Sequence, residues 1–171
     1  GRRGKLKERD SWIQSSQLFR FFYKNMLKDF DLWNEQKKNI ELVDTALVIC
    51  KRRQFWLCKI WENIWSEVSK SSPHMRPVLI INERLRGDLV VVIPMTTKYK
   101  EHADKYYHKI ESSSLYGLNQ DSYCMLDQIK VISKKRLIRK LNDYENGNST
   151  NIPLLDKDIF MEIVNKIHSF I

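Results

Sequence analysis

Apolar residues in the first third of the chain recur at α-helical spacing and predict two helical faces. The second face carries Trp33, Ile40 and Val43 with polar residues between them. Packing against other parts of the protein explains both faces, and we expect residues 1–48 to form a helical N-terminal extension. The first face consists of Phe19, Phe22, Tyr23, Met26, Leu27 and Phe30.

From Gln54 onward the apolar residues form short runs that are typical of β-strands. These runs are rich in β-branched and aromatic residues and are too short for separate helices. Arg86-Gly87-Asp88 has turn composition and separates two runs closely enough for a hairpin. The predicted strands are Phe55 to Cys58, Val78 to Ile81, Leu89 to Ile93, Tyr106 to Ile110 and Ser122 to Ile132.

Two loops and a final helix complete the pattern. Residues 111–121 and 142–153 are rich in polar turn-forming residues and predict surface loops. An amphipathic helix follows, with Asp156 and Asp158 near its start, where the helix dipole favours acidic side chains. We therefore expect one mainly β domain over residues 49–171 that ends in a helix. The apolar face of this helix comprises Ile159, Phe160, Ile163, Val164, Ile167 and Phe170.

The composition is that of a single soluble domain. Hydrophobic residues make up 42% and charged residues 30% of the 171 residues. No apolar stretch is long enough for a membrane span, and the basic N-terminus lacks the apolar core of a secretion signal, so we expect a cytoplasmic protein without a membrane partner. Cys50, Cys58 and Cys124 lie in apolar runs without metal-ligand spacing. We expect no disulfide framework, no metal and no cofactor.

The net charge of +9 favours polyanionic partners. A basic cluster without any acidic residue lies between residues 130 and 140. These cations either contact nucleic-acid phosphates or form a solvated basic face. The cluster consists of Lys130, Lys134, Lys135, Arg136, Arg139 and Lys140.

Common enzyme motifs are missing from the sequence. The five glycines do not cluster into a phosphate-binding loop, and no nucleophile elbow is present. The histidines are scattered, so a ribonuclease with paired histidines has no sequence support. Any catalysis is expected to use other side chains. The four histidines are His74, His102, His108 and His168.

Three motifs, which begin at Trp65, Ile93 and Leu126, occur in order along the chain, and together they resemble the MazF/PemK family of bacterial toxins. The first contains Trp65-Ser66-Glu67 followed by Arg76-Pro77-Val78, similar to the family's first loop and second strand. Ile93-Pro94-Met95-Thr96-Thr97 resembles the end of its third strand, and the run Leu126 to Leu137 resembles its Leu-x-Gln-Ile-Arg element. The resemblance covers about residues 53–141 and extends more loosely to the final helix.

The resemblance implies an SH3-like β-barrel of the MazF/CcdB type that is usually a homodimer. It also implies the toxin of a type II toxin–antitoxin system. Such a toxin is an endoribonuclease (mRNA interferase) that cuts single-stranded RNA without a metal. Attack by the ribose 2′-hydroxyl gives a 2′,3′-cyclic phosphate and a 5′-hydroxyl end. A cognate acidic antitoxin is expected to hold the toxin inactive.

The resemblance also assigns roles to single residues. Arg76 corresponds to the family's catalytic arginine and Thr96 to its partner threonine. Gln128 and Lys130 lie two apart on a predicted strand and so share a face, with Ile129 and Val131 on the other. Glu67 and His74 remain open candidates for the general base. The expected substrate-binding residues are Ser66, Glu67, Lys98, Gln128 and Lys130.

The chain departs from the family pattern in two places. Trp61 and Trp65 stand where the family commonly has glycine. Either the indoles stack on RNA bases, or the tryptophans are a sequencing or translation artefact, since tryptophan and glycine codons can differ by one base and some genetic codes read UGA as glycine. The stretch Met26 to Asn34 resembles the start of some family members, which makes residues 1–25 a candidate extension outside the native protein.

Two other functions remain alternatives at this point. A toxin of the CcdB branch has the same fold but binds DNA gyrase and cleaves nothing. Arg76, Thr96 and the element around Gln128 argue against it. The other alternative is a barrel that binds nucleic acid without cutting it.

Overall fold

The computed structural model describes residues 30–60, 75–99, 101–142 and 152–170. Two compact units, residues 1–36 and 37–171, make up the chain. Most of the first predicted helical face lies outside the described residues, as do Trp61, Trp65, Ser66 and Glu67. Within the described part of the chain, no helix has the length and apolar character needed to cross a membrane.

Helix α3 confirms the second predicted helical face. It runs from Phe30 to Glu41 and includes the last residues of the first unit and the first residues of the second. Trp33 and Ile40 are both buried, at the spacing of about two helical turns. Val43 lies beyond the end of the helix and is 36% exposed, so it does not extend this buried face.

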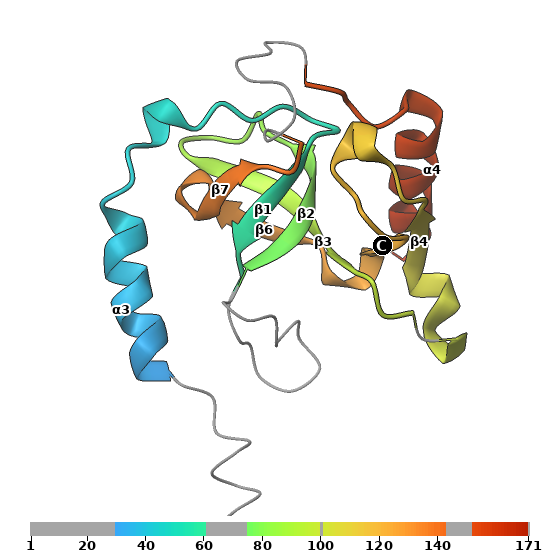
Figure 1. Ribbon diagram of the computed structural model, residues 1–171, viewed down its shortest axis with the longest axis horizontal. Coiled ribbons are helices and arrows are strands. Elements are labelled where there is room, and N and C mark those ends of the chain that lie inside the picture. Colours follow the sequence, from blue (N-terminus) through green and yellow to red (C-terminus); the bar gives the residue numbers. More distant parts are fainter. Residues whose placement is uncertain (1–29, 61–74, 100, 143–151, 171) are drawn as a thin grey trace, which may run out of the picture. The chain divides into compact units, whose positions relative to one another are not determined.

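Seven strands of the second unit form one antiparallel sheet (Figure 1). Each of the five predicted strand runs overlaps at least one of them. The sheet order is β4-β5-β3-β2-β1-β7, and β6 pairs with β3. The strands are β1 (Phe55–Lys59), β2 (Met75–Asn82), β3 (Leu89–Thr96), β4 (Tyr107–Ile110), β5 (Ser122–Met125), β6 (Lys130–Ser133) and β7 (Leu137–Lys140).

Strand β3 is the centre of the sheet because it pairs with three other strands, β2, β5 and β6. One edge pairs with β2 through the predicted hairpin. The other edge pairs with β6 from Leu89 to Val92 and with β5 at Met95 and Thr96. Pro94, which has no N–H to donate, lies between these two pairings. The sheet beside β6 therefore continues past Pro94 into the β5–β4 ribbon.

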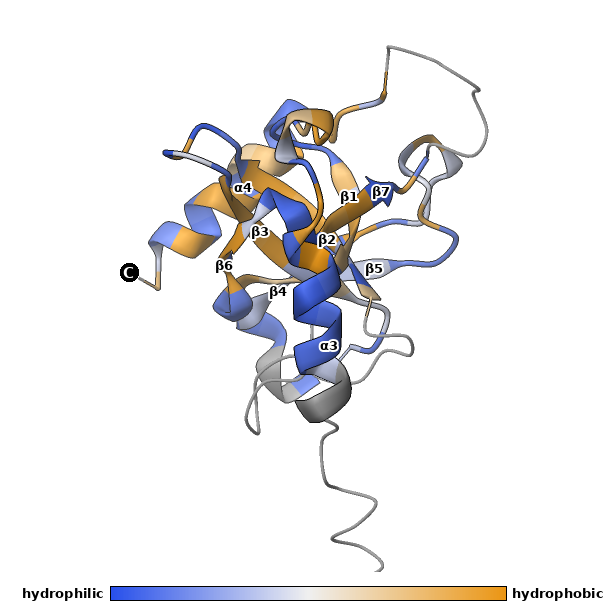
Figure 2. Ribbon diagram, turned by 90° about the vertical axis from the view of Figure 1, so that its left-hand side faces the viewer, coloured by the Kyte–Doolittle hydropathy of each residue, from blue (hydrophilic) through white to orange (hydrophobic). Residues whose placement is uncertain are grey.

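Hydrophobic clusters lie on both faces of the central strands. On one face, Leu79 and Ile93 pack in a cluster with Phe160 and Ile163 of the C-terminal helix. On the other face, Val78 and Val92 pack with Ile132 and Leu137 of the last two strands. We call these the helix-side cluster and the strand-side cluster. Figure 2 shows the central strands mostly in the orange of hydrophobic residues.

The outer strands curl the sheet around the strand-side cluster. Strand β7 pairs with β1, β6 pairs with β3, and a 3-10 helix, η5 (Lys134–Arg136), connects β6 to β7. A pairing of β6 with β7, which would close a barrel, does not occur among the described strands. The mainly β fold with an N-terminal and a C-terminal helix is confirmed, and closure into a barrel stays a prediction.

Helix α4 (Lys157–His168) begins where the sequence predicts it. Asp156 caps it by accepting hydrogen bonds from the backbone N–H groups of Ile159 (3.2 Å) and Asp158 (2.8 Å), which lower the pKa of its carboxyl group. The segment before the helix is held by Arg53. The backbone N–H of Leu155 donates to the Arg53 carbonyl at 2.9 Å, and Arg53 Nε donates to the Leu155 carbonyl at 2.5 Å.

The prediction of one continuous strand from Ser122 to Ile132 is wrong. The run is divided into β5 and β6 by a 3-10 helix, η4 (Leu126–Gln128). Leu126 is almost fully buried in the helix-side cluster, whereas Ile132 lies in the strand-side cluster. The chain therefore has to turn between these residues, and a straight strand would not let both clusters form.

Two glycines with positive φ provide a matched test of this packing. Gly117 (φ +69) ends the 3-10 helix η3 (Ser114–Tyr116), and a Cβ atom there would lie 2.5 Å from the carbonyl oxygen of Leu141. Gly87 (φ +73) has nothing within 4 Å of such an atom. We expect Gly87→Ala to lower the free energy of unfolding by about 1 kcal/mol, through backbone strain alone. Gly117→Ala should cost a further 1–3 kcal/mol, roughly, through overpacking.

Urea unfolding of both variants measures the difference. Equal losses for the two substitutions would show that Gly117 does not lie against residue 141.

Candidate functional site

Arg76 is the second residue of β2 and reaches towards β3. It shares a face of the sheet with Val78, and hence with the strand-side cluster. Its Nη1 donates a hydrogen bond to the carbonyl oxygen of Met95 at 3.2 Å. Its buried Nε has no hydrogen-bond partner among the described residues, and burial lowers the pKa of the guanidinium. A half-buried cation with donors left over is suited to bind an anion.

Thr96 ends β3, the strand next to that of Arg76. The ladder between β2 and β3 pairs Leu79 with Ile93 and Val78 with Pro94. Arg76 and Thr96 lie two residues beyond the pair Val78 and Pro94, so the alternation of each strand puts both side chains on the same face as that pair. Thr96 Oγ1 accepts a hydrogen bond from the backbone N–H of Lys98 at 3.1 Å. Because this bond uses an acceptor site, the hydroxyl proton remains available for donation.

The buried thiols near this pair do not offer a nucleophile. Cys58 is the partner of Arg76 on β1. Burial raises the pKa of the Cys58 thiol to about 12, although the positive charge of Arg136 opposes the shift. Burial also raises the pKa of Cys124 to about 12. Both thiols therefore carry their protons at neutral pH. In the ranges that the structure describes, no three His, Cys, Asp or Glu side chains form a group that could hold a metal ion.

Comparison with known proteins identifies the family. A family model described as "PemK-like, MazF-like toxin of type II toxin-antitoxin system" matches residues 51–171. The chain belongs to this toxin family. It is also similar to the solved structure of the Mycobacterium tuberculosis toxin MazF-mt6. The TM-score is 0.47 and the sequence identity 20%, over 68% of this chain and 94% of that chain. Comparison with curated proteins gives no match.

The structure brings together three of the residues predicted from the resemblance to MazF/PemK toxins. Arg76 and Thr96 lie on the same face of adjacent strands, and the backbone N–H of the exposed Lys98 donates to the Thr96 hydroxyl oxygen. Lys130 begins β6 and is paired with Val92 of β3. Val92 and Thr96 are four residues apart on β3 and share a face, so Lys130 lies on the same face of the sheet as Thr96. Ser66 and Glu67 lie outside the described residues.

The predicted common strand face of Gln128 and Lys130 is wrong. Gln128 is half-buried in the 3-10 helix η4, and only Lys130 belongs to β6. Ile129 and Val131, which the strand prediction put on the other side, are 38% and 58% exposed. Ile132 is buried instead. The turn at η4 breaks the alternation that a single strand would give.

Two lysines of the basic cluster, Lys135 and Lys140, make contacts within the protein. Lys135 Nζ donates to the carbonyl oxygen of Glu41 at 2.9 Å and to its carboxylate at 2.8 Å. Lys140 Nζ lies 5.6 Å from the ring centre of Trp56, its partner on β1. A cation–π contact of this kind holds the side chain in place. These two lysines therefore contribute to the fold, and the cluster is not simply a solvated face.

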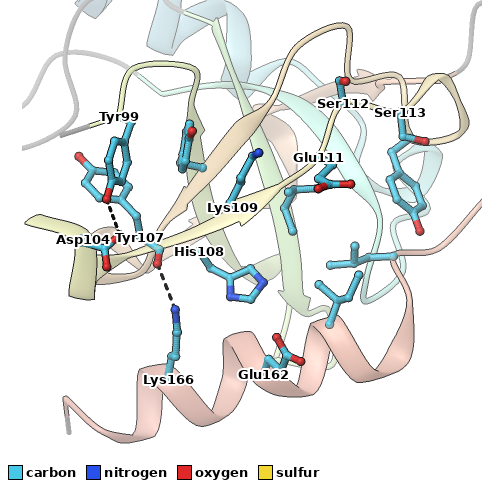
Figure 3. Close-up of a pocket in the computed structure, with 15 residues that line it drawn as sticks. Tyr99, Asp104, Tyr107, His108, Lys109, Glu111, Ser112, Ser113, Glu162 and Lys166 are labelled. Atoms are coloured by element: carbon cyan, nitrogen blue, oxygen red, sulfur yellow. Dashed lines mark hydrogen bonds between the residues drawn. The ribbon is translucent and has the colours of Figure 1, made fainter. Parts of the chain in front are cut away.

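A cavity of about 760 Å³ lies along β4 and extends to α4 (Figure 3). His108 of β4 lines it together with Glu162 and Lys166 of α4. Burial and the charge of Lys166 lower the pKa of His108, against the opposing effect of Glu162. Its partner Cys124 belongs to the helix-side cluster, so His108 lies on the face opposite Arg76. It is not placed to remove a proton at a phosphate held by Arg76.

Sequence reasoning missed a group of tyrosines next to Thr96. Tyr99 follows the Thr96 motif closely, which is the one signal that points to it. Tyr107 and Tyr123 lie on β4 and β5, on either side of a long loop. Their proximity depends on the pairing of these strands, which residue spacing along the chain does not reveal.

Because the half-buried Arg76 guanidinium has a donor with no partner among the described residues, we expect that this residue does not stabilise the folded protein and is present for function. Arg76→Met keeps the aliphatic length and removes the half-buried charge. We expect the free energy of unfolding to stay within about 1 kcal/mol of the wild-type value or to rise. Urea denaturation measures this. A loss of more than about 2 kcal/mol would instead mark Arg76 as a structural residue.

Proposed function

We propose that this toxin is a metal-independent endoribonuclease that cleaves single-stranded RNA. The observation that carries the proposal is that Arg76, half-buried with an unmatched Nε, lies on the same face of the sheet as Thr96 of the next strand, and donates to the carbonyl of the residue before Thr96. Membership of the PemK/MazF-like family supports it. The products are a 2′,3′-cyclic phosphate and a 5′-hydroxyl end.

RNA suits such a site because it carries its own nucleophile. The protein has to hold the ribose 2′-hydroxyl in line with the phosphorus and stabilise the additional negative charge of the pentacoordinate transition state. The Arg76 guanidinium can direct N–H donors at the non-bridging oxygens. The Thr96 hydroxyl can donate to one of the same oxygens while its own oxygen stays fixed by Lys98.

Further residues complete the proposed site. We assign Lys98, Gln128 and Lys130 to substrate binding. The backbone of Lys98 bonds to Thr96, and Lys130 of β6 lies on the same face of the sheet as Thr96. Ser66 and Glu67 are assigned to the same role by family resemblance. The residue that removes the 2′ proton is not assigned. Glu67 and His74 are candidates.

The proposed partners follow from the family and from the charge. A toxin of a type II system is inhibited by a cognate antitoxin, and the net charge of +9 favours one with an acidic binding segment. We also propose a homodimer, as the family resemblance implies.

Chelator resistance tests the reaction type. Purified protein incubated with a long single-stranded RNA in EDTA should give discrete cuts. Mass spectrometry should find a 2′,3′-cyclic phosphate on one product and a 5′-hydroxyl on the other. A 2′-deoxy substitution at the cut position should abolish that cut, because it removes the nucleophile. Cutting that stops in EDTA would contradict the proposal, and inhibition of gyrase without RNA cleavage would favour the CcdB-like alternative.

Substitutions at the paired residues test the site. Arg76→Lys keeps the charge but loses the planar fork of donors, and should lower kcat/KM about 100-fold. Thr96→Val should lower it about tenfold through loss of one hydrogen bond, and Thr96→Ser should restore it. Arg86→Lys is the matched control in the exposed hairpin turn and should change the rate less than about twofold. Equal rates for Arg76→Lys and Arg86→Lys would remove Arg76 from the site.

A further inference from the structure

Three tyrosines from separate segments pack together beyond the end of β3. The ring of Tyr99 stacks on that of Tyr123, with centroids 5.0 Å apart and planes at 30°. Tyr107 meets both rings edge-on, at 6.0 Å from Tyr99 and 6.2 Å from Tyr123. We call these residues the tyrosine cluster. Figure 3 shows Tyr99 and Tyr107 together at one end of the cavity.

The strand register aligns this cluster with the proposed catalytic pair. Thr96 pairs with Tyr123 on β5, and Tyr123 pairs with Lys109 on β4. Directly paired residues of antiparallel strands point to the same face. A row therefore runs across the sheet from Thr96 to Tyr123 and Lys109, and Arg76 lies on the same face of the sheet at the start of β2. Since neighbouring strands lie about 4.8 Å apart, Thr96 and Tyr123 are about this far apart at the backbone.

The tyrosines are not part of the hydrophobic core. None of the three belongs to either hydrophobic cluster, and Tyr99 is 42% exposed. The Tyr99 hydroxyl donates to Asp104 at 2.5 Å, and this bond raises the pKa of the phenol to about 12. The ring is thus held by two contacts: its hydroxyl is hydrogen-bonded to Asp104, and one of its faces stacks on Tyr123. An uncharged aromatic ring with an accessible side remains open to solvent.

The surroundings of the cluster contain both cations and carboxylates. The carboxylates of Asp104 and Glu101 act on Tyr99, whereas exposed Lys98 precedes Tyr99 in the chain and exposed Lys109 is paired with Tyr123. Lys109 forms an ion pair with Asp121 at 2.8 Å, which positions it at the sheet edge. Single-stranded nucleic acids combine phosphates with π-faces, and proteins bind them with cations and aromatic rings together.

We infer that the tyrosine cluster stacks an unpaired base of the RNA whose phosphodiester lies at Arg76 and Thr96. This inference rests on the proposed function and adds a subsite to it. The short distance along the row allows a base on the cleaved phosphodiester, or on the next one, to reach Tyr99. Every base has a π-face, so the cluster contributes affinity and a requirement for unpaired RNA more than a choice of sequence.

Binding of an RNA that cannot be cut tests the inference apart from catalysis. The probe is a labelled single-stranded oligonucleotide with 2′-O-methyl groups at every position, and fluorescence anisotropy gives its Kd. Tyr99→Ala should weaken binding about tenfold by loss of one stacked base. Tyr99→Phe keeps the ring and should stay within about threefold of the wild type, because stacking needs the π-face and not the hydroxyl.

Phe170→Ala is the matched control. Phe170 is 40% exposed and likewise packs against a tyrosine, Tyr106, with ring centres 5.4 Å apart. It follows α4, which covers the helix-side cluster on the opposite face of the sheet. Its loss should leave the Kd unchanged within about twofold. Equal melting temperatures of Tyr99→Ala and Phe170→Ala would exclude partial unfolding as the cause of a difference.

Abasic scanning shows whether the contact is direct. A single abasic position next to the cut should weaken binding to the wild type and have no further effect on Tyr99→Ala. Additive losses, or wild-type affinity for Tyr99→Ala, would overturn the subsite while cleavage by Arg76 and Thr96 still stood. If the wild type neither cuts RNA nor binds the probe, the proposed function itself is wrong, and the subsite with it.

Discussion

The structure depends on the antiparallel register between β2 and β3. Hydrophobic side chains cover both faces of these strands, with Leu79 and Ile93 on the helix side and Val78 and Val92 on the other. A slip of one residue would move every side chain to the opposite face, which both clusters forbid. The alternation of the same two strands puts Arg76 and Thr96 on one face of the sheet. The geometry of the proposed site is therefore fixed by burial on either side of the sheet, not by contacts between the two residues themselves.

That arrangement puts a cation where the protein interior would not favour one. Arg76 shares the face of a cluster whose other members are apolar, and burial already lowers the pKa of its guanidinium. One hydrogen bond to the Met95 carbonyl satisfies only part of its donor capacity. Such an arrangement costs free energy unless an anion completes it. The hydrophobic clusters supply the stability that allows this cost, and the net charge of the chain attracts anions.

Local sequence patterns predicted most elements, because each element carries its own periodicity. The runs around Phe55, Val78 and Leu89 read as strands, and the helix capped by Asp156 was evident from its apolar face. The division at η4 was not predictable in this way, because the two halves of an unbroken apolar run pack into different clusters. Arg76 and Thr96 were singled out by resemblance to a family, and their roles remain proposals. The tyrosine cluster arises from non-local strand pairing, which the order of residues does not record.

Thr96 physically connects the two halves of the proposed RNA surface. Its hydroxyl oxygen accepts from the backbone of Lys98 and so fixes the bend that follows β3. That bend returns Tyr99 onto Tyr123, the residue paired with Thr96 itself. One side chain thus helps to orient a proposed phosphate ligand and shapes the turn that presents the aromatic surface. In the proposed complex, binding of an unpaired base would therefore be coupled to alignment of its phosphodiester. A duplex, whose bases are already stacked and paired, would have to give up that stacking before the scissile phosphate could reach Arg76.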